Sequence, residues 1–166
     1  MKPLVVAAMF LVGPAGARAA DPGPVHLNAR SNYLERCGGC HGVRGQAFTA
    51  TVPDLKGRAG WFLCAPAGRD YVGRLPNIVF SGLSDSELAE LINYAVLDLG
   101  GDGAPKGAKP FTAEEVAKLR HRALTITDLQ AYRARVVAGL IESCGAPGGL
   151  ASDYAPVPDV APAGGQ

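Results

Sequence analysis

The feature that most constrains this chain is a group of two cysteines and a histidine within five residues, Cys37-Gly38-Gly39-Cys40-His41. Cysteines spaced in this way are typical of three kinds of site: a thioredoxin-like redox pair, half of a zinc site, and covalent haem attachment. A redox pair needs a strand-to-helix turn in an α/β pattern, and no convincing strand alternation is present. A zinc ribbon needs a second closely spaced pair, whereas the other cysteines, Cys64 and Cys144, lie far apart.

The histidine directly after the second cysteine favours the third kind of site. Two thiols at this spacing can bond the two vinyl groups of one haem while the adjacent imidazole reaches the iron. We therefore predict one covalently attached haem, haem c, held by Cys37, Cys40 and His41.

Residues 1–20 have the pattern of a cleaved export signal. Lys2 precedes an apolar run from Leu4 to Val12, and small residues end the segment at Ala19-Ala20. The apolar run is too short for a membrane span, which takes about 20 residues. We expect a periplasmic protein with no membrane span after cleavage.

Cleavage changes two residue counts that matter for function. It removes both methionines, Met1 and Met9, and two cations, so the formal charge of +1 falls to about −1. That balance gives no reason to expect nucleic acid as a partner.

Thiols without another role pair in an oxidising compartment, so we expect a disulfide between Cys64 and Cys144, with two free thiols as the alternative.

Apolar spacing predicts an all-α protein with four helices. The first spans about 27–36 and ends at a glycine pair. The second has Ser84 as N-cap and Glu87 at the capping-box position, the third begins at Thr112, and the fourth begins at Thr127 or Asp128. Between these helices, from 41 to 84, recurring glycine and proline predict loops and short helical turns.

The chain is therefore divided into a signal peptide at 1–20, a single domain at 21–144 and a tail at 145–166. The domain comprises a haem core of about 27–97 and a helical extension of about 98–144. The tail has five glycines, four prolines and five alanines, a composition that predicts flexibility.

Beyond the attachment motif, the stretch from Ala29 to Leu97 resembles class I cytochromes c, small helical folds around one haem. Ala29 and Tyr33 stand eight and four residues before Cys37, where the family has a small residue and an aromatic one. The stretch Leu83-Ser84-Asp85-Ser86-Glu87-Leu88 leads into a segment similar to the family's closing helix, which crosses the first one.

The resemblance implies a role for each matching residue. Cys37 and Cys40 would carry the thioethers, and His41 would be the proximal axial ligand. The Pro53 carbonyl would accept a hydrogen bond from the free nitrogen of His41, and Leu55 would pack against the haem. The alternative for Pro53 and Leu55 is an ordinary place in a loop and in the core.

The distal methionine of the family is missing, so the resemblance implies an atypical member. The loop that would supply it, 74–82, contains none, and neither does the rest of the chain beyond Met9. The distal position would be open or water-bound, or would be filled by one of four candidate side chains: His121, His26, Lys109 or Asn77. Without methionine the reduction potential should be lower than in a methionine-ligated relative.

Five residues in the loops after the motif are candidates for holding the haem propionates, which need charged or indole donors. They are Arg58, Trp61, Arg69, Tyr71 and Arg74, of which we favour Arg58 or Trp61.

The sequence thus predicts a periplasmic monohaem electron carrier rather than an enzyme, because no catalytic acid, base or nucleophile is evident. Its partners would be periplasmic redox proteins such as a dehydrogenase or an oxidase. One alternative is a haem-based sensor, ligand-binding module or enzyme with an open iron. Another is a non-catalytic subunit of a larger dehydrogenase.

Overall fold

The structure is a computed structural model that describes residues 25–49 and 52–155, with residues 25–28 described for the backbone only. The predicted export signal and the end of the predicted tail, 156–166, lie outside the described residues.

Helices make up all the regular structure in this part of the chain, which confirms the predicted all-α fold. The α-helices are α1 (Val25–Arg36), α2 (Gly38–His41), α3 (Pro66–Arg74), α4 (Pro76–Val79), α5 (Asp85–Asn93), α6 (Ala113–Arg120), α7 (Leu129–Cys144) and α8 (Leu150–Asp153). Two 3₁₀ turns, Ala59–Leu63 and Gly101–Gly103, and a π-helical segment that continues α5, Tyr94–Leu99, complete them. No helix within 25–49 or 52–155 is long and apolar enough to cross a membrane.

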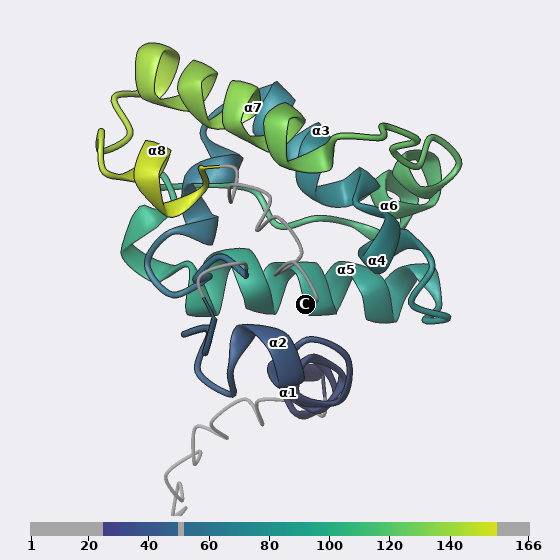
Figure 1. Cartoon of the computed structure of the whole chain (residues 1–166). Helices are drawn as coiled ribbons and strands as arrows, with labels where there is room; N and C mark the ends of the chain where they lie inside the picture. The colour runs from purple at the N-terminus through teal and green to yellow at the C-terminus, as the bar shows by residue number, and fades with distance from the viewer. Residues whose placement is uncertain (1–24, 50–51, 156–166) are drawn as a thin grey trace, which may run out of the picture.

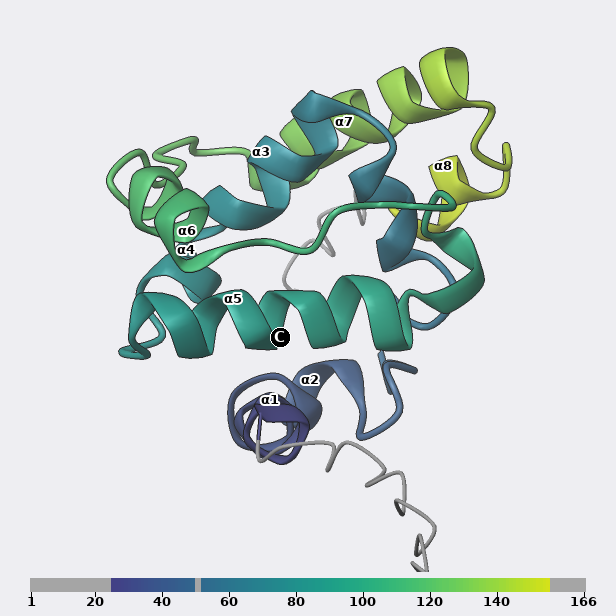
Figure 2. The same cartoon turned by 180° about the vertical axis from the view of Figure 1, so that it is seen from behind.

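The long helix formed by α5 and its π-helical continuation is the central element. Helices α1 and α2 lie on one side of it, and α3 and α7 lie on the other (Figure 1). The rings of Tyr33 on α1 and Tyr94, the first residue of the π-helical continuation, are 5.3 Å apart. Seen from behind, the chain after the π-helical segment returns along α5 to reach α6 (Figure 2). The first helix and the closing helix of the predicted haem core therefore contact each other.

Hydrogen bonds at the N-termini of three helices agree with the sequence analysis. Ser84 and Glu87 form a reciprocal capping box at the start of α5, and Thr112 caps α6. Asp128, one of the two predicted starts, caps α7 by accepting from the Ala131 amide over 2.8 Å. A side-chain oxygen here satisfies an amide that has no partner inside the helix. Helix α1 begins two residues before the predicted boundary.

Helix α3 is longer than the short turns that we predicted for the region between 41 and 84. The prediction took glycines as helix breakers. Instead, Gly68 lies against the Phe62 carbonyl and Gly73 against the Leu119 side chain, where a Cβ atom would collide. These glycines allow α3 to approach its neighbours closely, and that packing outweighs their low helix propensity.

An aromatic cluster joins the predicted core to the extension. Phe62 stacks on Tyr71 of α3 at 5.3 Å and meets the edge of the Tyr154 ring, also at 5.3 Å. Tyr71 in turn lies 6.0 Å from Tyr132 of α7. Aromatic pairs at such separations stabilise by about 0.5–1.5 kcal/mol beyond their buried area. The extension is thus part of one hydrophobic core rather than an appendage.

The predicted flexible tail is wrong for its first part, because residues 145–155 are folded. Gly145 ends α7 in the left-handed conformation, and α8 follows. Leu150 and Tyr154 are almost completely buried. Composition predicted disorder because glycine and proline dominate the segment, but these two side chains fill space against the core and offset the cost of ordering it.

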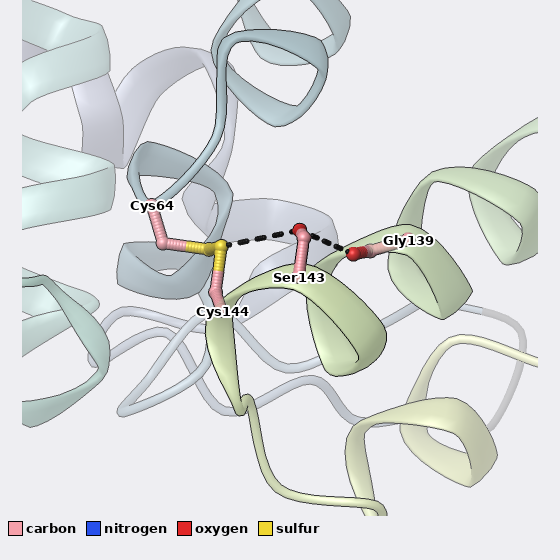
Figure 3. The surroundings of a disulfide bond; sticks show 4 residues. All are labelled: Cys64, Gly139, Ser143 and Cys144. Carbon is pink, nitrogen blue, oxygen red and sulfur yellow. Dashed lines mark hydrogen bonds between the residues drawn. A yellow bond between two sulfur atoms is a disulfide. The ribbon is translucent and has the colours of Figure 1, made fainter.

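Cys64 and Cys144 are joined by a disulfide, as we expected from the sequence. The bond connects the end of the 3₁₀ turn at 59–63 to the last residue of α7, with the Cα atoms 6.1 Å apart (Figure 3). Beside it, the Ser143 hydroxyl donates to the Gly139 carbonyl over 2.6 Å. The extension is therefore fastened covalently to the loop that follows the cysteine–histidine motif.

Candidate functional site

The cysteine–histidine motif forms a single helical turn at the end of α1. Cys37 occupies the N-cap position of α2, and its carbonyl accepts from the amides of Cys40 at 3.1 Å and His41 at 2.9 Å. Both cysteines are free thiols; Cys40 is exposed, and Cys37 is half-buried. Burial raises the pKa of the Cys37 thiol. The turn presents two unpaired thiols and an imidazole within one short stretch of backbone.

His41 and Pro53 are brought together in the structure. The His41 Nδ1 atom lies 2.9 Å from the Pro53 carbonyl oxygen. A carbonyl can only accept, so Nδ1 carries the proton and the lone pair of the neutral ring is at Nε2. Such a bond fixes the tautomer and orientation of a histidine that binds a metal through its other nitrogen.

Gly42 makes the turn that places the loop beside the histidine. Its φ is +72°, and a Cβ atom there would collide with the Gln46 carbonyl. The Gly42 carbonyl accepts a 2.6 Å hydrogen bond from the hydroxyl of Tyr33, whose side chain is fully buried. Burial raises the pKa of Tyr33 to about 12. The aromatic residue noted before the motif thus ties α1 to the chain just after His41.

Asp54 holds the loop around Pro53 through both its side chain and its backbone. Its carboxylate accepts from the Ala47 amide over 2.7 Å and lies 3.9 Å from Arg58. Its carbonyl accepts from the Tyr154 hydroxyl over 3.1 Å. We missed both residues in the sequence. Tyr154 carried a signal, because it is the one aromatic residue between 145 and 166.

Leu55 is half-buried against the hydrophobic core, two residues beyond Pro53. Its amide donates to the Gly45 carbonyl over 2.8 Å, and the Lys56 amide donates to the same oxygen over 3.0 Å. These bonds close the loop from 45 to 56. Pro53 and Leu55 therefore lie in a segment whose end is hydrogen-bonded back to Gly45, four residues after His41.

Large apolar side chains are exposed in segments close to the motif, which suits a flat apolar cofactor. Phe48, in the loop after His41, is 80% exposed, and Phe80 is 76% exposed. Arg36, the last residue of α1, donates to the Ser81 carbonyl over 2.5 Å, so the loop carrying Phe80 lies beside the start of the motif. Together with the free thiols and the oriented imidazole, this surface fits a covalently held haem.

Three of the four distal candidates have exposed side chains in the structure. Asn77 lies on α4, His121 follows the last residue of α6, and Lys109 lies on the connection before α6. Ser81, four residues after Asn77, accepts the hydrogen bond from Arg36 at the start of the motif. The side chain of His26 lies outside the described residues. The distal ligand stays a prediction with these alternatives open.

The propionate candidates are engaged in different contacts. Three arginines hold acidic partners: Arg58 with Asp153, Arg69 with Glu115, and Arg74 with Asp70. Tyr71 is buried. Within the described part of the chain, the Trp61 side chain forms no hydrogen bond and is half-buried, so its N–H is available as a donor.

The helical fold is that of a cytochrome c, with a first and a closing helix in contact and the cysteine–histidine turn directly after the first helix. The chain is 32% identical over 147 residues to a cytochrome c-552 from Thermus thermophilus, covering 78% of this chain and 94% of the relative. It is 34% identical over 119 residues to a second cytochrome c-552 from Thermus thermophilus, covering 61% of this chain and 91% of the relative. No family model matches the sequence. The chain belongs to the c-type cytochromes.

Proposed function

We propose that this protein binds one haem covalently through Cys37 and Cys40 and carries single electrons. The observation that supports this most is the His41 Nδ1 atom, 2.9 Å from the Pro53 carbonyl, on a helical turn with two free thiols. That bond leaves the Nε2 lone pair free to bind the haem iron, and thioether formation would add each S–H across a vinyl group. The sequence similarity to two cytochromes c-552 also favours electron transfer by a haem protein.

When bound, the haem supplies the one-electron chemistry, and the protein supplies position and environment. His41 would be the proximal ligand, with its orientation fixed by Pro53. The exposed rings of Phe48 and Phe80 and the half-buried Leu55 would cover apolar haem surface. Arg58 or Trp61 would donate to the propionates; Arg58 is paired with Asp153, whereas the Trp61 N–H has no hydrogen-bond partner among the described residues.

The distal side carries the second candidate function. No methionine occurs in the chain after Met9, so the ligand typical of the family is missing. An open or water-bound site would let the iron bind a small molecule, which favours a ligand-binding, sensing or catalytic haem protein. A nitrogen or oxygen ligand such as His121, Lys109 or Asn77 would favour a carrier of low potential instead.

We also propose that the protein works in the periplasm after cleavage within residues 1–20 and exchanges electrons with a dehydrogenase or an oxidase. The disulfide between Cys64 and Cys144 supports an oxidising compartment. As an alternative, the folded extension would serve as the docking surface of a subunit in a larger dehydrogenase. Gel filtration and co-purification would separate a free carrier from such a subunit.

Covalent attachment is tested by expressing the protein with a haem-maturation system and measuring its intact mass. The expected mass is that of the chain plus one haem, retained after denaturation and acid–acetone extraction. The Cys37→Ala/Cys40→Ala variant should lose it, whereas the matched Cys64→Ala/Cys144→Ala variant should keep it. Release of the haem from the native sequence by extraction would contradict the proposal.

The distal ligand and the two candidate functions are tested by absorption spectra of the ferric and ferrous protein, with and without carbon monoxide or cyanide. Rapid, tight binding of carbon monoxide or cyanide would favour the open-iron function. Spectra that these ligands leave unchanged would favour a six-coordinate electron carrier. A ferric charge-transfer band of the kind that methionine coordination produces would contradict the assignment of a methionine-free site. Redox titration should give a lower midpoint potential than a methionine-ligated relative.

A further inference from the structure

The segment after α7 reaches across the molecule to the loop that carries Pro53. Tyr154 is 2% exposed, and its hydroxyl donates to the Asp54 carbonyl over 3.1 Å. Asp54 directly follows Pro53, so this bond holds the peptide unit next to the carbonyl that accepts from His41. A segment 100 residues further along the chain thus contacts the support of the histidine.

A second contact fastens the same loop to α8. Arg58 donates through Nε to Asp153 over 2.5 Å, and its Nη1 lies 3.9 Å from Asp54. The Asp54 carboxylate also accepts from the Ala47 amide over 2.7 Å. The loop is therefore held by the Ala47 amide, which precedes it in the chain, and by α8, which lies about 100 residues further on.

Two neighbours, Phe62 and Arg133, make three contacts that hold Tyr154 in place. The edge of its ring meets Phe62 at 5.3 Å, and the Arg133 guanidinium lies 5.6 Å from the ring centre. Arg133 also donates to the Tyr154 carbonyl over 3.4 Å. Burial raises the pKa of the Tyr154 hydroxyl, so it keeps its proton at any physiological pH.

We propose that Tyr154, assisted by the Arg58–Asp153 pair, is a positioning residue for His41, because it fixes the Pro53 carbonyl against the Nδ1 proton. A well-placed carbonyl increases the electron donation of the imidazole to a metal and favours the oxidised state. A displaced carbonyl reduces that donation and raises the reduction potential. Since this role presupposes that His41 binds the iron, it rests on the function proposed above.

The test uses the haem-loaded full chain with Tyr154→Phe, which keeps the ring and removes only the hydroxyl. The matched control is Tyr132→Phe, from the same aromatic cluster, whose hydroxyl forms no hydrogen bond with the described residues. Two quantities are measured: the midpoint potential, and the solvent exchange rate of the His41 Nδ1 proton in the reduced protein by NMR.

For Tyr154→Phe we expect a higher midpoint potential and exchange of the ring proton about five-fold faster, the factor that corresponds to a hydrogen bond of about 1 kcal/mol. Asp153→Asn, which keeps Tyr154 and weakens the contact with Arg58, should shift both quantities in the same direction by less. The control should match the native protein. Equal values for Tyr154→Phe and the native protein would overturn the proposal, as would an equal shift in Tyr132→Phe.

Amide hydrogen exchange keeps the test independent of the iron. The Ala47 amide, which donates to Asp54, should exchange faster in Tyr154→Phe than in the control. If the native protein shows no histidine-ligated haem, the proposed function fails and the positioning role with it. If the haem is histidine-ligated and Tyr154→Phe leaves the potential and the exchange rates unchanged, only the positioning role fails.

Discussion

Asn93 and Phe111 are joined by two hydrogen bonds. The Asn93 side-chain amide donates to the Phe111 carbonyl over 3.0 Å, and the Phe111 amide donates to the Asn93 side-chain oxygen over 2.7 Å. Arg69 stacks over the Phe111 ring at 4.0 Å and donates to the carbonyls of Lys109 and Pro110. The connection to α6 is thereby held against the last residue of α5 and against α3.

Replacing Asn93 with alanine should destabilise the protein by about 2–3 kcal/mol, because two hydrogen bonds are lost and two backbone groups lose their partner. Asn93→Asp keeps an acceptor for the Phe111 amide but loses the donor to its carbonyl, so its loss should be intermediate. Urea unfolding followed by circular dichroism measures both. An Asn93→Ala variant as stable as the native protein would show that the connection is held without this contact.

Breaking the Cys64–Cys144 disulfide should lower the free energy of unfolding substantially. The bond closes a loop with a sequence separation of 80 residues, which corresponds to about 4–5 kcal/mol in the chain-entropy model. Unfolding is compared for the native protein and Cys64→Ala/Cys144→Ala, each with and without a reductant. The reductant should destabilise only the native protein. Two titratable thiols in the denatured, unreduced holoprotein would refute the bond.

Arg120 connects α6 to the segment between α4 and α5. Its guanidinium donates to the carbonyls of Val79 and Leu83 and to the Asp85 carboxylate. Arg120→Ala should cost about 2 kcal/mol and increase amide exchange in that segment. The matched control is Arg122→Ala, which removes a more exposed ion pair and should cost about 0–1 kcal/mol. Equal losses in the two variants would mean that Arg120 has no special role in holding the segment.

Stability should fall at alkaline pH in part because of Tyr33. Burial raises its pKa from 10.0 to about 12, so the folded state favours the protonated hydroxyl. The resulting stabilisation is fully present below pH 10 and is lost as the pH rises through about 12. Urea unfolding at a series of pH values should show a shallower alkaline loss in Tyr33→Phe than in the native protein. Parallel losses in the two proteins would exclude Tyr33 as a contributor.

Local sequence patterns were sufficient for much of the fold. Ser84, Thr112 and Asp128 marked helix starts because a capping side chain acts on backbone amides only a few residues away. The same approach failed for α3, where Gly68 and Gly73 are explained by neighbours that come from other parts of the chain. It failed again at 145–155, where composition alone did not reveal that Leu150 and Tyr154 are buried.

The sequence by itself determined the chemistry of the site, because the spacing of Cys37, Cys40 and His41 is a local property of five residues and the absence of methionine after Met9 is a matter of composition. Only the tertiary structure decided what surrounds that chemistry. The bond between His41 and Pro53 was expected from the family resemblance, and the structure brings the two residues together. The hydrogen bond from the Tyr154 hydroxyl to the Asp54 carbonyl and the pair of bonds between Asn93 and Phe111 were not expected, and they join residues 100 and 18 positions apart. Such contacts depend on how whole helices pack, so no short window of sequence contains them.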